Sequence, residues 1–263
     1  MCSRAAALGW RVVGTVHSGP STGVHLDVTS PASVARVFAE VRPDAVVHAA
    51  SVLGNSPSGP AARNWAVNAV GAAHVAAAAT ACGARLVHVS SDAVHSGRPE
   101  PYTEDDPPSP VYPYGAAKAA AETVVAAVAP SAAVVRTSLI VSGGRGPLSK
   151  HERLALALAR GEGDGVLFTD DIRCPVAVDD LADALLELAA SQFAGVLNVA
   201  GPQPLSRYDL GVAVVRRHGL DPSRVPAGTI ARAGLHRPGC IRLDGTLAGR
   251  LLRTRLRRVD GTE

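Results

Sequence analysis

Short runs of apolar, often β-branched residues alternate with longer alanine-rich stretches along most of the chain. The short runs are continuously apolar, which is typical of strands covered on both faces in a parallel sheet. This alternation predicts an α/β fold, a doubly wound, Rossmann-like parallel sheet with right-handed crossovers. The expected strands are residues 11–16, 23–26, 45–48, 85–89, 133–136 and 196–199, and the expected helices are residues 31–41, 64–82, 115–128 and 178–190.

The strand–helix rhythm loosens beyond residue 143 into glycine-rich loops and isolated helices, such as one at residues 206–218. We therefore expect residues 1–142 to form the Rossmann-like domain and residues 143–263 to form mainly a smaller lobe that caps a substrate. The helix and strand within residues 178–200 are expected to return to the sheet domain.

The composition fits a folded protein with a sizeable core, since 47% of the 263 residues are hydrophobic and 19% are charged. The beginning of the chain shows no secretory signal. The uncharged stretch 64–84 contains Asn68, His74 and Thr80, so a helix buried against a sheet is favoured over a membrane span. We expect a cytoplasmic protein.

Metal and nucleic-acid sites are not expected. The four cysteines form no CxxC pair and the nine histidines form no HxxxH or HExxH pair. The formal net charge is only +3, and one dense basic run stands near the C-terminus, at Arg250, Arg253, Arg255, Arg257 and Arg258. No aromatic residue interleaves with this run. A solvated face is the favoured interpretation, and a phosphate-binding tail is the alternative.

The strongest candidate for chemistry is a tyrosine–lysine pair, Tyr114 and Lys118, at the start of a predicted helix. Residues four apart lie on one face of a helix, which places the phenol beside the ammonium group. A nearby cation favours the phenolate, so we expect Lys118 to lower the pKa of Tyr114 toward the range of a general acid or base.

Hydroxyl groups follow the predicted strand at residues 85–89, at Ser90 and Ser91, and Asp92 comes next. The carboxyl ends of parallel strands face the crevice in which α/β sheets bind ligands, so these side chains are candidates for a site. They can also cap the turn that follows, and that alternative stays open.

These motifs, in this chain order, resemble those of the extended short-chain dehydrogenase/reductases, and within that family the dTDP-4-dehydrorhamnose reductase group. The resemblance runs from about residue 5 to the end of the chain. Its motifs are Ser90-Ser91-Asp92, Tyr114-Gly-x-x-Lys118, His48-Ala-Ala, Asn68-Ala-Val-Gly71, Val135-Arg-Thr-Ser138, Arg173-Cys-Pro-Val176, Leu205-Ser-Arg-Tyr-Asp209 and Arg237-Pro.

The resemblance implies that Tyr114 donates a proton to a sugar ketone and that Lys118 holds the nicotinamide ribose. It implies that Ser91 hydrogen-bonds the developing alkoxide, while Ser90 positions the turn. It also implies further cofactor-binding residues, namely Asp27, Ala49, Ala50, Asn68, Thr137 and Ser138, and the substrate-binding residues Asp92 and Arg173.

The choice of cofactor depends on the residues that follow the strand expected at 11–16. His17 and Ser18 stand there, with no carboxylate that would repel a 2′-phosphate, so NADP is favoured and NAD is the alternative. Both residues can equally be plain turn residues. Ala93 and Leu139 stand where reductases of the family often carry aromatic rings, which leaves another ketone open as the substrate.

We therefore predict an NADP-dependent reductase of a 4-keto nucleotide sugar, in carbohydrate biosynthesis, with Tyr114 as the proton donor. One alternative is a noncatalytic regulatory protein on the same fold, and another is a sugar-nucleotide epimerase. A dehydratase is not favoured, because Ala93 follows Asp92 where a second carboxylate would be needed. No nucleic-acid or membrane partner is expected, and a homodimer stays open.

The beginning of the chain is short for this fold. A dinucleotide-binding fold opens with a strand, a glycine-rich turn and a helix, which with the next strand take about 30 residues. Only ten residues precede Arg11. We expect the first strand and glycine loop to be missing, with either a misassigned start codon and the segment encoded upstream or a protein of poor cofactor affinity. The strands at 11–16 and 45–48 should then flank a gap or be drawn together abnormally.

Overall fold

The computed structural model describes residues 1–19, 23–52 and 61–260, and it divides into two compact units. Unit 1 comprises Met1–Val94, Tyr112–Val135 and Ala182–Leu197, and unit 2 comprises His95–Val111, Arg136–Leu181 and Asn198–Glu263.

A four-stranded sheet organises unit 1, with the strand order β10-β5-β4-β3. Its strands are β3 (Ala45–His48), β4 (Arg85–Val89), β5 (Ala133–Thr137) and β10 (Gly195–Val199), of which the last two continue into unit 2. β3 and β4 are parallel, with Ala45 opposite Arg85 and His48 opposite His88, and β4 and β5 are also parallel. The parallel sheet expected from the continuous apolar runs is confirmed.

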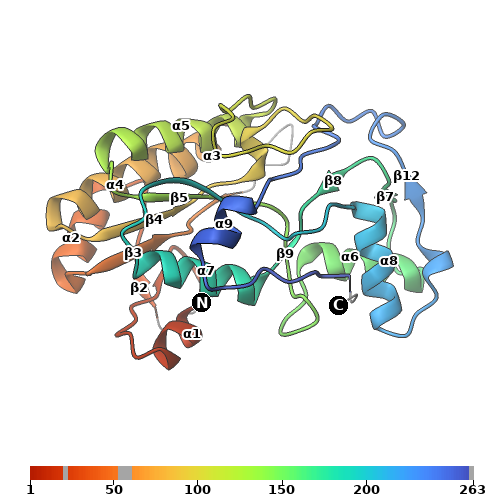
Figure 1. Ribbon diagram of the computed structural model, residues 1–263, viewed down its shortest axis with the longest axis horizontal. Helices are drawn as coiled ribbons and strands as arrows, with labels where there is room; N and C mark the ends of the chain where they lie inside the picture. Colours follow the sequence, from red (N-terminus) through yellow and green to blue (C-terminus); the bar gives the residue numbers. More distant parts are fainter. Residues whose placement is uncertain (20–22, 53–60, 261–263) are drawn as a thin grey trace. The chain divides into compact units, whose positions relative to one another are not determined.

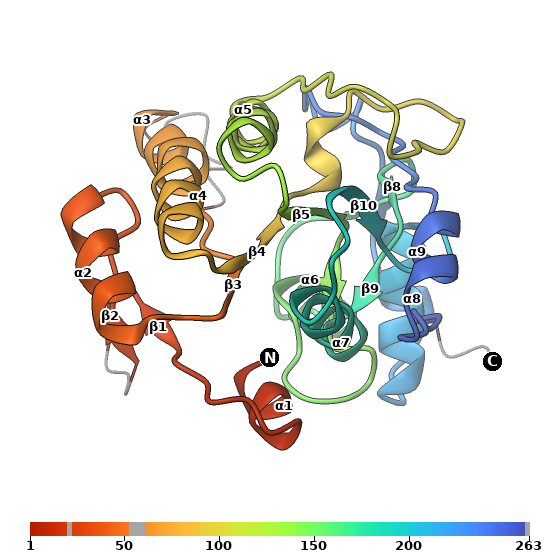
Figure 2. The ribbon, with the colours of Figure 1, turned by 60° about the vertical axis from the view of Figure 1, so that its left-hand side comes forward.

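Helices α2 (Pro31–Val41), α4 (Gly71–Cys82) and α5 (Pro113–Val128) pack against this sheet through one apolar core. α2 begins after Ser30, whose hydroxyl accepts a hydrogen bond of 3.2 Å from the backbone nitrogen of Ser33. Figure 2 shows α4 and α5 on one side of the strands and α7 (Val178–Ala189) on the other. The core includes Val34, Phe38, Val75, Ala76, Leu86, Ala121 and Val125.

The longest helical stretch joins α3 (Ala61–Trp65), a turn of wide π-type helix η1 (Ala66–Val70) and α4. Its part Ala62–Cys82 is long and apolar enough to cross a membrane. Four of its residues, Ala72, Val75, Ala76 and Ala79, nevertheless lie in the core of unit 1. The prediction of a helix packed in the core is therefore confirmed.

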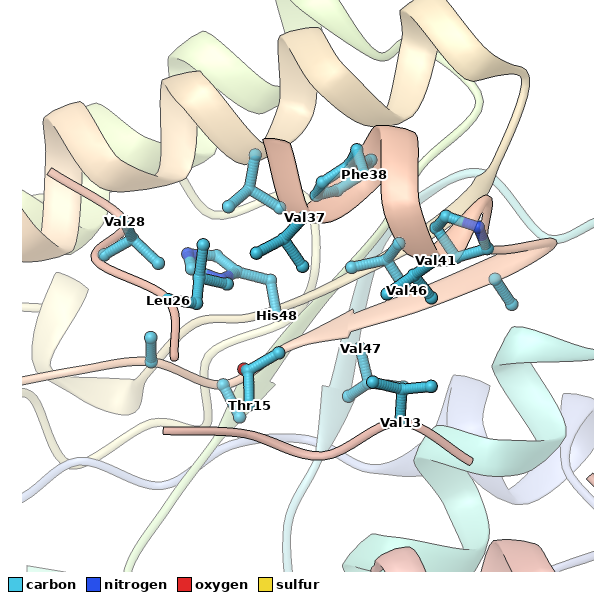
Figure 3. Close-up of a pocket in the computed structure, with 15 residues that line it drawn as sticks. Val13, Thr15, Leu26, Val28, Val37, Phe38, Val41, Val46, Val47 and His48 are labelled. Atoms are coloured by element: carbon cyan, nitrogen blue, oxygen red, sulfur yellow. The ribbon is translucent and has the colours of Figure 1, made fainter. Parts of the chain in front are cut away.

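Strands β1 (Thr15–Val16) and β2 (Val24–His25) form a separate two-stranded parallel sheet. The predicted strand 11–16 is thus reduced to its last two residues. A cavity of about 170 Å³ lies between this pair and β3, and Figure 3 shows Val13, Thr15, Val46 and Val47 around it, with Phe38 of α2.

Unit 2 contains helices rather than a large sheet. α6 (Lys150–Arg160) begins with a capping box, in which the side chains of Ser149 and Glu152 each bond the other's backbone nitrogen. α6 and α8 (Arg207–Arg217) share a second apolar core with β6 (Ile140–Val141) and β7 (Leu167–Phe168).

Three small sheets accompany these helices in unit 2 (Figure 1). β6 pairs with β9 (Val176–Ala177), β7 with β12 (Ala227–Gly228), and β8 (Ile172–Arg173) with β11 (Leu205–Ser206). The expectation of isolated helices without further sheet beyond residue 143 is therefore wrong in detail. The remaining elements are α1 (Cys2–Ala7), η2 (Asp92–Val94), η3 (Pro222–Arg224) and α9 (Thr246–Leu251).

Candidate active site

The hydroxyl group of Tyr114 lies within a polar cluster of unit 1. Tyr114 is the second residue of α5, whose first residue, Pro113, favours a helix start. Its hydroxyl is hydrogen-bonded to the side chains of Ser91 and Ser51, and the carboxylate of Asp92 acts on it electrostatically. Ser51 and Ser91 follow the neighbouring parallel strands β3 and β4. The fold thus brings Ser91, Asp92 and Tyr114 to one edge of the sheet.

The pKa of Tyr114 is raised, in the direction opposite to the sequence prediction. Burial of the phenol is the largest cause and the Asp92 carboxylate adds to it, whereas the hydrogen bonds with Ser51 and Ser91 lower the pKa. The prediction of a lowered pKa for Tyr114 is therefore wrong. A raised pKa keeps the phenol protonated at neutral pH, which is the form that a proton donor needs.

Lys118 lies one helix turn beyond Tyr114 and is only 2% exposed. Its ammonium group donates a hydrogen bond of 2.5 Å to the carbonyl oxygen of Val89 in β4. Burial lowers the pKa of Lys118 to about 8, and the carboxylate of Glu122 partly offsets that shift. Lys118 is thus a buried cation with a pKa near the physiological range.

Glu122 is a candidate site residue that the sequence prediction missed. It is buried, and its Oε1 accepts a hydrogen bond of 2.6 Å from the hydroxyl of Ser90. Ser90 therefore faces Glu122, in keeping with a positioning role. The signal that could have found Glu122 is its spacing, because Tyr114, Lys118 and Glu122 follow one another at intervals of four along one helix face.

Asn68 supports the site from within η1. Its Oδ1 accepts hydrogen bonds from the hydroxyl of Ser51, at 2.8 Å, and from the backbone nitrogen of Val52, at 3.2 Å. Its Nδ2 donates to the carbonyl oxygen of Val52 and to Oδ1 of Asn64, at 3.0 and 2.5 Å. Asn68 is buried, so this arrangement fixes the hydroxyl of Ser51 next to Tyr114.

Two buried histidines lie behind the site, His48 in β3 and His88 in β4. They are opposite each other in register, with ring centroids 5.3 Å apart. Burial, together with the charge of Lys118, lowers the pKa of His48 to about 3 and that of His88 well below its usual value. Both rings are therefore neutral at neutral pH. Among the described residues, Nε2 of His48 and both ring nitrogens of His88 find no hydrogen-bond partner.

The cofactor-side residues predicted in unit 1 lie after its strands. His17 and Ser18 follow β1 directly and are exposed. Ala49 and Ala50 follow β3, are also exposed, and line the cavity of Figure 3 together with His48.

Asp27 follows β2 and is part of a tight turn. Its Oδ1 accepts hydrogen bonds from the backbone nitrogen and the hydroxyl of Thr29, at 2.9 and 2.7 Å. These bonds lower the pKa of Asp27. The carboxylate is therefore ionised and held in place at neutral pH.

These residues fit a dinucleotide only in part. The small side chains of Ala49 and Ala50 leave room beside the buried ring of His48, and no carboxylate stands at His17 and Ser18 to exclude a 2′-phosphate. No glycine-rich turn leads from a strand into a helix in the part of unit 1 that the structure describes. That part therefore offers no cradle of backbone amides for a pyrophosphate.

Thr137, Ser138 and Arg173 belong to unit 2. Thr137 is buried, and its hydroxyl finds no hydrogen-bond partner among the described residues. The hydroxyl of Ser138 accepts a hydrogen bond of 3.2 Å from the backbone nitrogen of Cys174. Ser138 therefore fixes the chain next to β8, whereas the hydroxyl group of Thr137 is available for a further hydrogen bond.

Arg173 is buried and has structural partners. Its guanidinium forms an ion pair of 2.8 Å with Asp171 and donates hydrogen bonds of 3.0 and 3.1 Å to the carbonyl oxygens of Pro238 and Gly239. These contacts hold the segment that contains Pro238 against β8.

Comparison with known proteins places this chain in a family. The family described as the RmlD substrate binding domain matches residues 1–258. The dTDP-4-dehydrorhamnose reductase of Mycobacterium tuberculosis is 36% identical over 211 residues, which are 78% of this chain and 68% of that protein.

Solved structures have the same architecture. A hypothetical dTDP-4-dehydrorhamnose reductase from Sulfolobus tokodaii aligns with a TM-score of 0.82 and 26% identity, over 98% of this chain and 93% of that one. The dTDP-4-dehydrorhamnose reductase of Bacillus anthracis, in complex with NADP, aligns with a TM-score of 0.80 and 24% identity, over 89% and 84%.

The predicted Rossmann-like α/β fold is confirmed by these structures. The prediction of an oxidoreductase is confirmed by the relatives, which are reductases. The chain belongs to the family of the RmlD substrate binding domain.

Proposed function

We propose that this protein reduces the 4-keto group of a nucleotide sugar with NADPH, as an extended short-chain dehydrogenase/reductase of the dTDP-4-dehydrorhamnose reductase type. The observation that carries the proposal is the hydrogen-bonded set of Ser91 and Tyr114, with the buried ammonium group of Lys118 one helix turn away. The names of the relatives, and the NADP in the Bacillus anthracis structure, support it.

Reduction of a ketone adds a hydride to the carbonyl carbon and a proton to the oxygen. NADPH, when bound, supplies the hydride. The O–H bond of Tyr114 breaks as its proton passes to the alkoxide oxygen, and Ser91 donates a hydrogen bond to that same oxygen. The charge of Lys118 stabilises the resulting phenolate through the low-dielectric interior of unit 1.

Substrate recognition is assigned to the remaining predicted residues. We place the cofactor mainly on residues 1–142 and the substrate mainly on residues 143–263, with residues 178–200 returning to the sheet. Asp92 and Arg173 are the proposed substrate-side residues, with Arg173 acting through the segment that it holds. A cytoplasmic location and a homodimer remain predictions.

A second candidate function is a noncatalytic binding protein on the same fold. It is favoured by one observation, that Ala93 and Leu139 stand where reductases of the family often carry aromatic rings. Such a protein would bind nicotinamide cofactor weakly and would turn over no keto sugar.

The deciding experiment is NADPH oxidation with dTDP-4-dehydrorhamnose and a panel of other keto sugars. For the reductase, we expect Tyr114→Phe to lower kcat by at least about a hundredfold without changing NADPH affinity, because it removes only the transferred proton. Tyr112→Phe is the matched control, since its ring stacks 6.5 Å from that of Tyr114. Equal turnover by Tyr114→Phe and the parent would exclude this mechanism, and turnover of no keto sugar would favour the second candidate.

A further inference from the structure

A large cavity in unit 2 is lined by arginines that the proposed reaction does not use. Its volume is about 1330 Å³, and all its lining residues belong to unit 2. The arginines are Arg145, Arg242, Arg253, Arg255, Arg257 and Arg258. Four of them come from the basic run near the C-terminus, in the segment that follows α9 in Figure 1.

The described lining of the cavity holds one carboxylate, that of Asp244, beside its six arginines. Asp244 lines the cavity, Nε of Arg257 lies 2.9 Å from Asp180, and Arg258 lies 3.1 Å from Asp260. The lining itself thus contains more positive than negative side chains among its described residues. Bringing like charges together around a cavity is unfavourable without a compensating anion.

Two of the arginines are well placed to bind a ligand. Arg145 and Arg255 have exposed side chains, and neither forms an ion pair within the described structure. Guanidinium groups bind phosphate oxygens in a bidentate manner, and two or more of them suit a diphosphate. The cavity is large enough for a nucleoside diphosphate, because pockets of about 300–1,000 Å³ bury ligands of that size.

We propose that this cavity binds the diphosphate group of a small ligand, with Arg145 and Arg255 as principal contacts. The proposal does not rest on the proposed reduction, because Ser91, Tyr114 and Lys118 all belong to unit 1. It supports the phosphate-binding alternative for the basic run, whose five arginines are all exposed.

The lining also determines what the site does not recognise. No aromatic ring is among its described residues, so nothing in it can stack on a base. The ligand is therefore recognised by its phosphates, and pyrophosphate, ADP and dTDP are expected to bind within about threefold of one another. Single-stranded nucleic acid, which binds through stacked aromatics, is not the expected ligand.

Calorimetric titration of the whole chain with inorganic pyrophosphate tests the site. We expect saturable binding of one pyrophosphate per chain, weakening as salt is raised from about 50 to 200 mM. Arg255→Ala and Arg145→Ala should each weaken pyrophosphate binding about tenfold. Arg255→Lys should weaken it less, because lysine keeps the positive charge but cannot form the bidentate hydrogen bonds of a guanidinium group. Arg250→Ala is the matched control, because it belongs to the same run but does not line the cavity.

Some results would overturn the proposal. One is an absence of saturable binding by the parent chain. Another is a loss in Arg250→Ala as large as that in Arg255→Ala, which would show only a diffuse basic surface. Tighter binding of a single-stranded oligonucleotide than of pyrophosphate would also exclude a diphosphate site.

A second titration identifies the source of the diphosphate. If a nucleotide sugar displaces pyrophosphate, and Arg255→Ala weakens both ligands equally, the diphosphate is that of the sugar nucleotide. If pyrophosphate still binds when the nucleotide sugar is saturating, the ligand is a free nucleotide or polyphosphate. Either result supports a diphosphate site and stands whether or not the protein reduces a ketone.

Discussion

Unit 1 and unit 2 each bury a charged side chain, but the two charges differ in how far neighbouring groups compensate them. Lys118 in unit 1 is 2% exposed and has one backbone carbonyl and the nearby carboxylate of Glu122 to compensate it. Asp171 in unit 2 is fully buried and forms ion pairs with three arginines, Arg173, Arg207 and Arg237.

This difference in compensation indicates that Lys118 is a reactive group and Asp171 a structural one. A buried charge is unfavourable by several kcal/mol unless partners compensate it. Because Lys118 is compensated only in part, its pKa falls to about 8 and its charge can change near the working pH. Asp171 is surrounded by opposite charge, so it fixes the strands and loops that carry its arginines.

The largest expected effect comes from removing the Asp171 charge. Asp171→Asn should lower the free energy of unfolding by about 3–5 kcal/mol, because it leaves the buried guanidinium of Arg173 uncompensated. Urea unfolding measures this change. The exposed Asp164→Asn is the control and should stay within about 0.5 kcal/mol of the parent. A loss below about 1 kcal/mol in Asp171→Asn would remove the contrast between the units.

Lys118 should behave in the opposite way, with function lost and stability kept. Lys118→Met should reduce turnover at least about a hundredfold, because no charge remains to stabilise the phenolate of Tyr114. Its unfolding free energy should change by less than about 1 kcal/mol, since relief from burying a charge offsets the lost bond to Val89. Steady-state kinetics and urea unfolding on the same sample check both expectations. A stable variant with parental turnover would contradict them.

The neutral ring of His48 predicts a loss of stability in acid. The pKa of His48 is about 3 in the folded protein and 6.5 in the unfolded chain. Below pH 6.5 the unfolded chain therefore binds a proton at this histidine that the folded protein does not bind, which favours unfolding. This histidine should destabilise the fold by up to about 2 kcal/mol at pH 5 relative to pH 7.

Replacing His48 by asparagine tests this dependence on pH. His48→Asn should reduce the difference in unfolding free energy between pH 7 and pH 5 by that same amount, measured in urea. The exposed His236→Asn controls for the substitution itself. An unchanged pH 5 to 7 difference in His48→Asn would show that the ring accepts a proton in the folded state.

The smallest expected effect is a shift in a pH profile. Glu122 raises the pKa of Lys118, so Glu122→Gln should lower that pKa further. The alkaline limb of the rate profile should then move down by about 0.5–1 pH unit, which a series of kcat measurements between pH 6 and 10 detects. A profile that keeps its position would mean that Glu122 acts only by holding Ser90.

The sequence predicted most accurately the helices and strands whose bounds are set by their own residues. β3, β4 and α2 have the predicted bounds, because their apolar runs end at clear signals, such as Ser30 before α2. The strand expected at 11–16 pairs only at its last two residues, since a strand also needs a neighbour, and β2 reaches only those two. Pattern alone cannot supply that information.

The sequence predicted which residues form the candidate site, but it did not predict the direction of the pKa shift of Tyr114 or the hydrogen-bond partner of Lys118. The spacing of Tyr114 and Lys118 placed them on one helix face, yet it could not show that the ammonium bonds the carbonyl of Val89. Glu122 escaped notice because a glutamate on a helix is usually a solvated residue. In unit 2, α6 was missed although Ser149 and Glu152 form a capping box that the sequence displays.

The π-type turn η1 has a consequence for how this helix can change. A wide turn holds one more residue than an α-helical turn, and each residue of an α-helix advances about 100° around the axis. Removing a single residue from η1 would therefore rotate Asn68 away from Ser51, while the apolar stripe of α4 kept its face toward the core. Deleting one residue here would thus turn the side chains before the deletion relative to those after it. The two parts of the helix therefore have different roles, since η1 positions Asn68 at the site and α4 packs in the core.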